Sequence, residues 1–417
     1  MVLVTLDTLR YDAFWDDRAQ STTMPRLVAR ARRGLWFERA FSATSTTQPT
    51  HASLMTGRPP WEHAVLQNGV PLPPDVDTIS EHLAAHGFET AAVVGSFPLA
   101  RGSGFEQGFG IFDDELTRGS TRPERRPANE EGDVPFYRLG DAVTDAAIRT
   151  LERLQSQKQF VWVHYFDAHS PYGDTAGGDR LSPGFILERV RAGDPVGELL
   201  TRARTLYDTD VRNLDTALDR LLARLDADRD RFVTHVVIVS DHGESFGDDG
   251  SVAHGKRLTQ AQIHVPLVIL SPAVKAARRV DVAGSIDVTA TLASLAGAPW
   301  DLPGARDLSA GPLAGARAFG MRRTFVRARS ETRIDGKAYP LEPRFFFVAE
   351  PDGTLFTGNS ERLTDSTGAA PAIPAARDAE VRQTFATFEA SLASHERPVE
   401  PPNAETERAL RALGYAD

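Results

Sequence analysis

An apolar run, Val2–Leu6, leads directly into a carboxylate at Asp7. Such a run is typical of a buried strand, and a carboxylate at its end costs free energy unless a cation meets it. A divalent metal ion would be such a cation. A salt bridge with Arg10 would serve equally well, so Asp7 alone leaves both interpretations open.

A second apolar run, Val236–Val239, is followed closely by Asp241, His242, Gly243 and Glu244. This pattern places a hard oxygen ligand and an imidazole side by side at a strand end, and the glycine permits a sharp turn after them. The two side chains together therefore indicate a metal site. The alternative is a turn in which the aspartate caps the backbone.

A hydroxyl-rich stretch around Thr47 precedes a predicted helix over Thr50–Thr56. Backbone N–H groups and the helix dipole favour an anion at a helix N-terminus. A hydroxyl placed there beside a metal can act as the nucleophile of ester cleavage. In isolation, the same run of serine and threonine would be only a helix N-cap.

The elements that would position these residues alternate along the chain. The strand-like runs are Val2–Leu6, Thr90–Val94, Phe160–Phe166, Val236–Val239 and Val265–Leu270, and the segments with helical spacing include Thr78–Gly87 and Ala142–Leu154. This alternation predicts an α/β fold with a mainly parallel sheet and helices on both faces. Since ligands bind beyond the carboxyl ends of such strands, Asp7, His169 and Asp241 should lie near one another.

Further along, Leu206–Leu225 has the spacing of a long amphipathic helix. Two segments rich in Gly, Pro and charged residues, Thr117–Asp133 and Gly173–Pro183, are either surface loops or lids over the site.

After Asp301 the pattern changes to short strand-like runs and a final helix. These elements are Thr324–Ala328, Arg344–Val348, Thr354–Phe356 and the helix Ala379–His395. We therefore predict a catalytic domain over residues 1–310 and a small C-terminal α+β domain, an antiparallel sheet with a helix, over residues 311–417.

The composition is that of an ordinary globular enzyme, with 41% hydrophobic and 25% charged residues. A net charge of -10 argues against nucleic-acid binding, which needs a basic surface. The absence of cysteine excludes disulfides and thiolate ligands. We expect no signal peptide or membrane span, and hence a cytoplasmic protein, although a trimmed exported protein would have the same sequence.

Taken together and in this order, the motifs resemble those of the sulfatase-like branch of the alkaline phosphatase superfamily. The stretches that carry the resemblance are Val4–Asp12, Thr47–Arg58, Phe166–Tyr172, Asp241–Gly247, His254–Lys256 and Ile286–Gly297. The resemblance implies four ligands of one divalent metal: Asp7, Thr47, Asp241 and His242. It further implies three residues that face the substrate anion or leaving group: His169, His254 and Lys256.

Two positions depart from the sulfatase pattern in ways that bear on the substrate. His51 stands where sulfatases usually have an arginine, so its part in substrate binding is open. Sulfatases oxidise a cysteine or serine at the nucleophile position to formylglycine, whereas this sequence has Thr47, which cannot form that aldehyde.

Family members with a threonine nucleophile are typically phosphodiesterases, phosphonate hydrolases, or phosphoethanolamine and phosphoglycerol transferases. The resemblance therefore implies hydrolysis of phosphate or phosphonate esters through a phosphothreonine intermediate at Thr47. The general acid would be His254 or His169. The alternatives are a true sulfatase and a non-catalytic binding protein on the same fold.

The expected cofactor is one divalent ion, either zinc or manganese, since calcium prefers more oxygen ligands. A second ion would use Asp167, His169 or His254. The expected partner is a small anionic ester, and the alcohol portion of that ester and the oligomeric state stay open.

Overall fold

The structure is a computed structural model of the 417-residue chain. It describes residues 1–20, 22–116, 136–173, 180–323, 344–365 and 368–395, together with residues 397 and 406. The predicted loop Thr117–Asp133, the central part of Gly173–Pro183 and the strand-like run Thr324–Ala328 lie outside these residues.

A nine-stranded sheet forms the centre of the described chain, with the order β4-β3-β5-β1-β6-β8-β2-β7 and with β9 also paired to β2. Its strands are β1 (Val2–Leu6), β2 (Leu35–Phe41), β3 (Glu89–Val94), β4 (Ile111–Asp113), β5 (Gln159–Tyr165), β6 (Val236–Ser240), β7 (His264–Val265), β8 (Leu267–Leu270) and β9 (Ala277–Gly284). Strands β4, β3, β5, β1 and β6 are parallel, whereas β8 runs antiparallel to β6. The predicted α/β class with a mainly parallel sheet is therefore confirmed.

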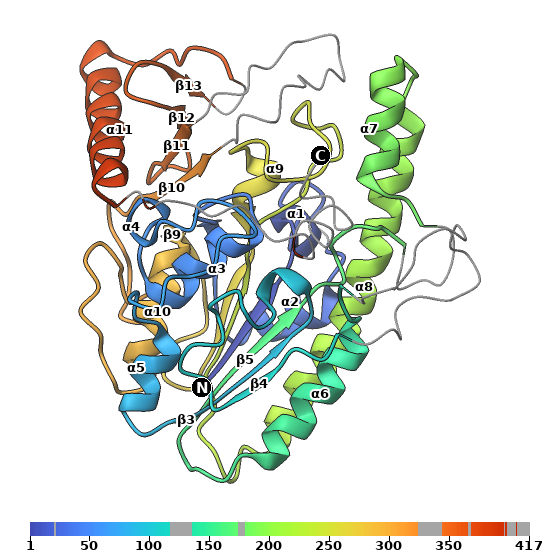
Figure 1. Ribbon diagram of the computed structural model, residues 1–417, viewed down its shortest axis with the longest axis vertical. Coiled ribbons are helices and arrows are strands. Elements are labelled where there is room, and N and C mark those ends of the chain that lie inside the picture. The colour runs from blue at the N-terminus through green and yellow to red at the C-terminus, as the bar shows by residue number, and fades with distance from the viewer. Residues whose placement is uncertain are drawn as a thin grey trace.

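Helices cover both faces of this sheet, with α6 and α8 on one face and α3, α5 and α10 on the other (Figure 1). The helical elements are α1 (Tyr11–Phe14), α2 (Pro25–Ala31), α3 (Thr47–Thr56), α4 (Pro60–His63), α5 (Ile79–Ala85), the 3₁₀ turn η1 (Phe97–Leu99), α6 (Gly140–Arg153), α7 (Pro183–Ala192), α8 (Gly197–Ala227), α9 (Gln260–Ile263) and α10 (Ser285–Leu295). Along β1, Leu3 packs into one core, whereas Val4 and Leu6 pack into the other, as the two-residue period of a strand requires. Among the described helices, none has the length and hydropathy that crossing a bilayer requires.

The predicted strands lie at β1, β3, β5 and β6, but the run Val265–Leu270 forms two short strands. Pro266 separates them because proline has no N–H to donate to a ladder. Strands β2 and β9 were not predicted. Both carry charged residues, and the first half of β9 is largely exposed, so neither shows the apolar run of a fully buried strand.

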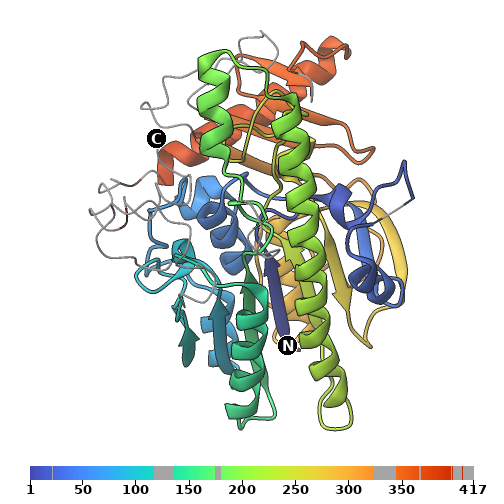
Figure 2. The ribbon, with the colours of Figure 1, turned by 90° about the vertical axis from the view of Figure 1, so that its right-hand side faces the viewer.

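A four-stranded antiparallel sheet, β10-β11-β12-β13, forms the C-terminal part of the described chain. Its elements are β10 (Ala318–Arg323), β11 (Arg344–Ala349), β12 (Leu355–Gly358) and β13 (Leu363–Asp365), together with helix α11 (Ala375–His395). This small sheet lies beyond the end of the large sheet at which β1 ends (Figures 1 and 2). The predicted C-terminal α+β region is confirmed, and the boundary at residue 310 stays a prediction.

Candidate active site

The ends of β1 and β6 bring Asp7 and Asp241 together. The two strands are parallel neighbours with Leu6 opposite Ser240, so the next residue of each strand lies at the same edge. Both aspartates and His242 are fully buried. One potential ligand atom from each of these three residues lies within 4.8 Å of the other two.

These three side chains present acceptor atoms to one another. His242 Nδ1 lies 3.0 Å from the Gly243 carbonyl oxygen, so this nitrogen carries the proton and Nε2 offers a lone pair. Nε2 lies 3.5 Å from Asp241 Oδ2 and 3.9 Å from Asp7 Oδ1. Both Asp7 oxygens and Asp241 Oδ2 accept no hydrogen bond from the described residues. Burial raises the pKa of both carboxyl groups and lowers that of His242. Two carboxylates and an imidazole lone pair in this arrangement fit a divalent cation.

The backbone fixes Asp241 in this orientation. Its Oδ1 accepts hydrogen bonds from the N–H groups of Thr8, at 3.1 Å, and His242, at 2.7 Å. Thr8 has a φ of 55°, which is uncommon for a residue other than glycine. The capping role considered for Asp241 thus describes Oδ1, while Oδ2 lies 3.5 Å from His242 Nε2 and 3.7 Å from His51 Nδ1. Arg10, the alternative partner of Asp7, forms ion pairs with Asp12 and Asp248.

Thr47 is the first residue of α3, with Thr46 as its N-cap. The helix therefore begins three residues earlier than the predicted Thr50. The Thr47 Oγ1 atom lies 3.4 Å from His242 Nε2, beside the three acceptor groups. In the preceding segment, Ser42 Oγ donates to the Asp241 carbonyl oxygen, so the segment is tied to the end of β6.

His51 lies one turn further along α3 and is fully buried. Its Nδ1 donates to the Thr47 carbonyl oxygen at 2.8 Å and lies 3.7 Å from Asp241 Oδ2. Its ring is 5.0 Å from that of His164. This side chain thus lies beside Asp241 and His164, and its predicted contact with substrate stays a prediction.

The rings of His169 and His254 lie beside His242. The His254 ring centroid is 4.4 Å from that of His242 and 5.0 Å from that of His169. His254 Nδ1 lies 3.2 Å from Oε1 of Glu244, a fully buried carboxylate. His169 stacks on Phe166, and its Nδ1 lies 2.7 Å from the Ser170 carbonyl oxygen. Lys256, which is partly buried, follows two residues after His254.

Sequence reasoning assigned no role to His164 or Glu244, which the structure places at the site. His164 Nε2 lies 3.5 Å from Asp7 Oδ2 and 3.1 Å from Ser96 Oγ, and its Nδ1 lies 3.0 Å from Thr5 Oγ1. Burial lowers the pKa of His164 to about 3, so the ring is neutral. In the sequence, the one indication of a role for His164 was that it is the single imidazole inside the apolar run Phe160–Phe166.

Asp167, considered for a second ion, instead caps a helix. Its Oδ1 accepts the Gly140 N–H at 2.8 Å, at the start of α6, and burial raises its pKa to about 7. Over the described part of the chain, the converging set of three ligands is the one at Asp7, Asp241 and His242. A second ion therefore stays a prediction, and among the described residues no second group of three ligands converges to hold it.

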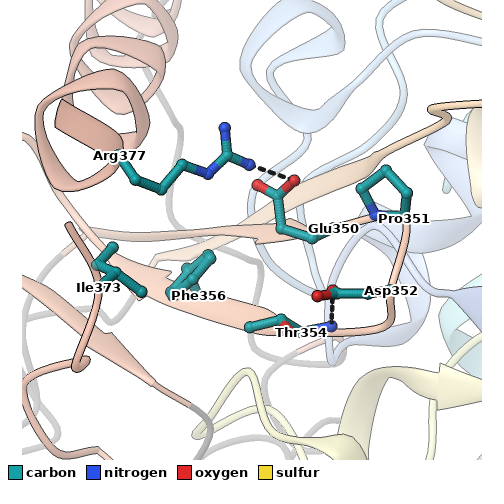
Figure 3. Close-up of a pocket in the computed structure, with 7 residues that line it drawn as sticks. All are labelled: Glu350, Pro351, Asp352, Thr354, Phe356, Ile373 and Arg377. Atoms are coloured by element: carbon teal, nitrogen blue, oxygen red, sulfur yellow. Dashed lines mark hydrogen bonds and ion pairs between the residues drawn. The ribbon is translucent and has the colours of Figure 1, made fainter.

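A separate hollow of about 420 Å³ lies on the small sheet near the start of α11 (Figure 3). Its lining residues are Glu350, Pro351, Asp352, Thr354, Phe356, Ile373 and Arg377. The carboxylate of Glu350 already forms ion pairs with Arg377 and Arg317. None of the candidate catalytic residues lines it, so it forms no part of this site.

Comparison with known proteins finds similar sequences and similar folds. The sulfatase family model matches residues 1–298, a range that contains every candidate site residue. The choline-sulfatase of Rhizobium meliloti (strain 1021) is 24% identical over 350 residues, which are 71% of this chain and 67% of that protein. The phosphoethanolamine transferase EptA of Salmonella typhimurium (strain LT2) is 39% identical over 66 residues, 15% of this chain and 12% of that protein. The phosphonate monoester hydrolase of Agrobacterium radiobacter has a similar fold, with a TM-score of 0.68 and 20% identity over 94% of this chain and 95% of that one.

Proposed function

The chain belongs to the sulfatase family, whose members hydrolyse ester bonds, and from that premise we propose that it cleaves phosphorus esters with Thr47 as the nucleophile. The observation that carries the proposal is the place of the Thr47 hydroxyl. It lies at the N-terminus of α3, 3.4 Å from His242 Nε2 and beside the acceptor set of Asp7 and Asp241. Because threonine cannot become formylglycine, phosphate monoesters, phosphodiesters or phosphonate esters are the proposed substrates.

The acceptor set would hold one divalent ion, zinc or manganese. When bound, such an ion would neutralise charge on the phosphoryl oxygens and favour the ionised form of the nearby hydroxyl. In our proposal, Thr47 Oγ1 attacks phosphorus in line with the departing alkoxide, which gives a phosphothreonine ester and the alcohol. Water then attacks the phosphothreonine and frees Thr47, which releases phosphate from a monoester, a phosphate monoester from a diester, or a phosphonate from a phosphonate ester. The dipole of α3 favours an anionic group at this place, because Thr47 is the first residue of the helix.

We assign the general acid to His254 rather than His169, because their hydrogen bonds differ. His254 Nδ1 faces the Glu244 carboxylate, a charged acceptor that orients the ring. His169 Nδ1 donates to a carbonyl oxygen, so its Nε2 carries a lone pair, and burial lowers its pKa. In this assignment, His254 protonates the leaving oxygen and Lys256 attracts the anion.

The test uses the purified chain loaded with zinc or manganese and four aryl substrates: 4-nitrophenyl phosphate, bis(4-nitrophenyl) phosphate, 4-nitrophenyl phenylphosphonate and 4-nitrophenyl sulfate. We expect kcat/KM for at least one phosphorus ester to exceed that for the sulfate by about a hundredfold, or ~2.7 kcal/mol. Thr47→Ala should abolish turnover, Thr47→Ser should retain part of it, and Thr46→Ala serves as the neighbouring hydroxyl control. Sulfate cleavage at an equal or higher rate would contradict the proposal, as would activity in Thr47→Ala.

A further inference from the structure

Strand β10 sends its alternate side chains to two different parts of the molecule. Phe319 and Met321 pack into the core beneath α11. Residues at alternate positions of a strand point to opposite faces. Ala318, Gly320 and Arg322 accordingly face the large sheet and the loops at its edge.

The first of these contacts is with the segment that leads into Thr47. The Met321 N–H donates to the Ala43 carbonyl oxygen at 3.0 Å. At Gly320, a Cβ atom would lie 2.0 Å from that same oxygen, so a residue with a side chain cannot take this place without moving the backbone. The Ala43 N–H in turn donates to Ser285 Oγ at 3.0 Å. The segment before Thr47 is thus held by β10 at one backbone group of Ala43 and by Ser285 at the other.

The second contact is with the loop that carries His254 and Lys256. The Arg322 side chain, in a residue only 6% exposed, donates from a guanidinium nitrogen to the Gly255 carbonyl oxygen at 3.1 Å. Gly255 adjoins the nucleophile segment, since a Cβ atom there would lie 3.8 Å from the Ser45 carbonyl oxygen. Burial lowers the pKa of Arg322 to about 9, so holding the guanidinium here costs free energy.

We propose that Arg322 is a positioning residue of the active site, which holds His254 and Lys256 in place through the Gly255 carbonyl while Gly320 and Met321 fix the segment before Thr47. The inference rests on the proposed function, in which His254 protonates the leaving oxygen and Lys256 attracts the anion. Strand β10 thus helps to position the active site, although it follows both segments that it contacts, at Ala43 and Gly255, by more than 60 residues in the chain.

The test compares Arg322→Met, which removes the donors and keeps an apolar stem, with Arg322→Lys, which keeps a donor. The control is Arg317→Met, which breaks an ion pair with Glu350 in the same small sheet. We expect Arg322→Met to lower kcat about tenfold or more for a methyl phosphorus ester, and much less for the 4-nitrophenyl ester, whose leaving group needs no protonation. Arg322→Lys should recover part of the loss, and the zinc affinity measured by calorimetry should not change.

Binding of inorganic phosphate to the zinc-loaded protein separates this inference from the proposed function. Arg322→Met should weaken phosphate binding about tenfold through the displaced Lys256, whereas Arg317→Met should not. Weaker phosphate binding in Arg322→Met alone would support the positioning role, whether or not the wild-type protein cleaves a phosphorus ester. Absence of cleavage by the wild-type protein would refute only the proposed function. Unchanged phosphate affinity, or an equal loss of kcat for both esters, would overturn the positioning role. If Arg322→Met does not fold, the same kcat and phosphate-affinity measurements are made on Arg322→Lys and compared with wild type.

Discussion

At the scale of single residues, the site is defined by a set of acceptor atoms that face one another. Asp7, Asp241 and His242 are fully buried, and no described residue donates to the two inward-facing oxygens of Asp7 or to Asp241 Oδ2. Such a set destabilises the folded protein unless a cation or a proton compensates it. The family membership and this set together explain why a divalent ion is the expected cofactor.

Metal removal should therefore lower stability. A divalent ion at 100 times its Kd stabilises the folded state by about 2.7 kcal/mol, so zinc should raise the Tm and a chelator should reverse the rise. Asp241→Asn keeps an oxygen for the two backbone N–H groups but removes the charge, and it should fold without showing the metal-dependent rise. Thermal unfolding with and without zinc measures this, with Asp248→Asn on the same loop as control. An equal rise in Asp241→Asn would contradict the predicted ligand role.

His164 lies beside a proposed metal ligand, so its replacement should affect metal binding. Its Nε2 lies 3.5 Å from Asp7 Oδ2, and its other nitrogen is held by Thr5. Outer residues that orient a metal ligand by hydrogen bonding typically contribute about 10–100-fold to metal affinity, and we expect the His164 ring to turn toward Asp7 in this role when the metal is bound. We expect His164→Leu to weaken zinc binding by that factor in a competition with a chelator. His86→Gln, at the exposed C-cap of α5, should leave the affinity unchanged, and an equal effect of the two substitutions would contradict the prediction.

At the scale of elements, a buried histidine joins the nucleophile helix to its neighbour. The Val65 N–H donates to His63 Nδ1 at 3.1 Å, so Nε2 carries the proton and donates to Ser53 Oγ at 3.0 Å. Burial lowers the pKa of His63 to about 3. Helices α3 and α4 are thus connected by an imidazole that must stay neutral.

This arrangement predicts a pH dependence of stability. Since the folded pKa of His63 is about 3 and the unfolded value is 6.5, the unfolded chain binds the proton first as the pH falls. His63 therefore contributes stability above pH 6.5 that is lost toward pH 3, at up to about 1.4 kcal/mol per pH unit. Urea denaturation at pH 7, 6 and 5 gives the free energy of unfolding of the wild type and of His63→Gln. The difference between the two should fall with pH at this slope. The slope from other buried histidines cancels in that difference, and parallel curves would refute the prediction.

At the scale of the whole molecule, the small sheet is joined to the large one by aromatic packing as well as by β10. Trp61 of α4 stacks on Phe388 of α11 with ring centroids 4.0 Å apart, and its ring lies 6.0 Å from that of Phe346. Trp61 is buried in the core of the small sheet although it follows the nucleophile helix in the chain. The C-terminal part is thus packed directly against the helices that carry the site.

Trp61→Ala should therefore destabilise the protein by about 3–5 kcal/mol, the usual cost of truncating a buried aromatic side chain. The change in the free energy of unfolding can be measured by urea denaturation. Trp300→Ala is the matched control, because Trp300 is only partly buried and stacks on His82. A loss below about 1 kcal/mol in Trp61→Ala would show that this contact contributes little to holding the two sheets together.

The sequence alone was sufficient for the parts of the molecule that depend on local pattern. The apolar runs before Asp7 and Asp241 marked two neighbouring strand ends, because a buried parallel strand needs a continuous apolar stretch. The class of fold, the long helix α8 and the C-terminal α+β region followed from periodicity in the same way, although α8 begins at Gly197 rather than Leu206. The identity of Thr47 also limits the chemistry without any structure, since only certain side chains can become an aldehyde.

Only the tertiary structure decided which distant residues meet. His164 has the pattern of a core residue in its strand, and its closeness to Asp7 arises from the pairing of β1 with β5. Strands β2 and β9 carry charges because their positions in the sheet leave part of them exposed, so no apolar run marked them. The contacts of Gly320 with Ala43 and of Arg322 with Gly255 join segments far apart in the chain. Hydrophobic periodicity encodes which face of an element is buried, but not which partner buries it, and that choice is made by the packing of the whole chain.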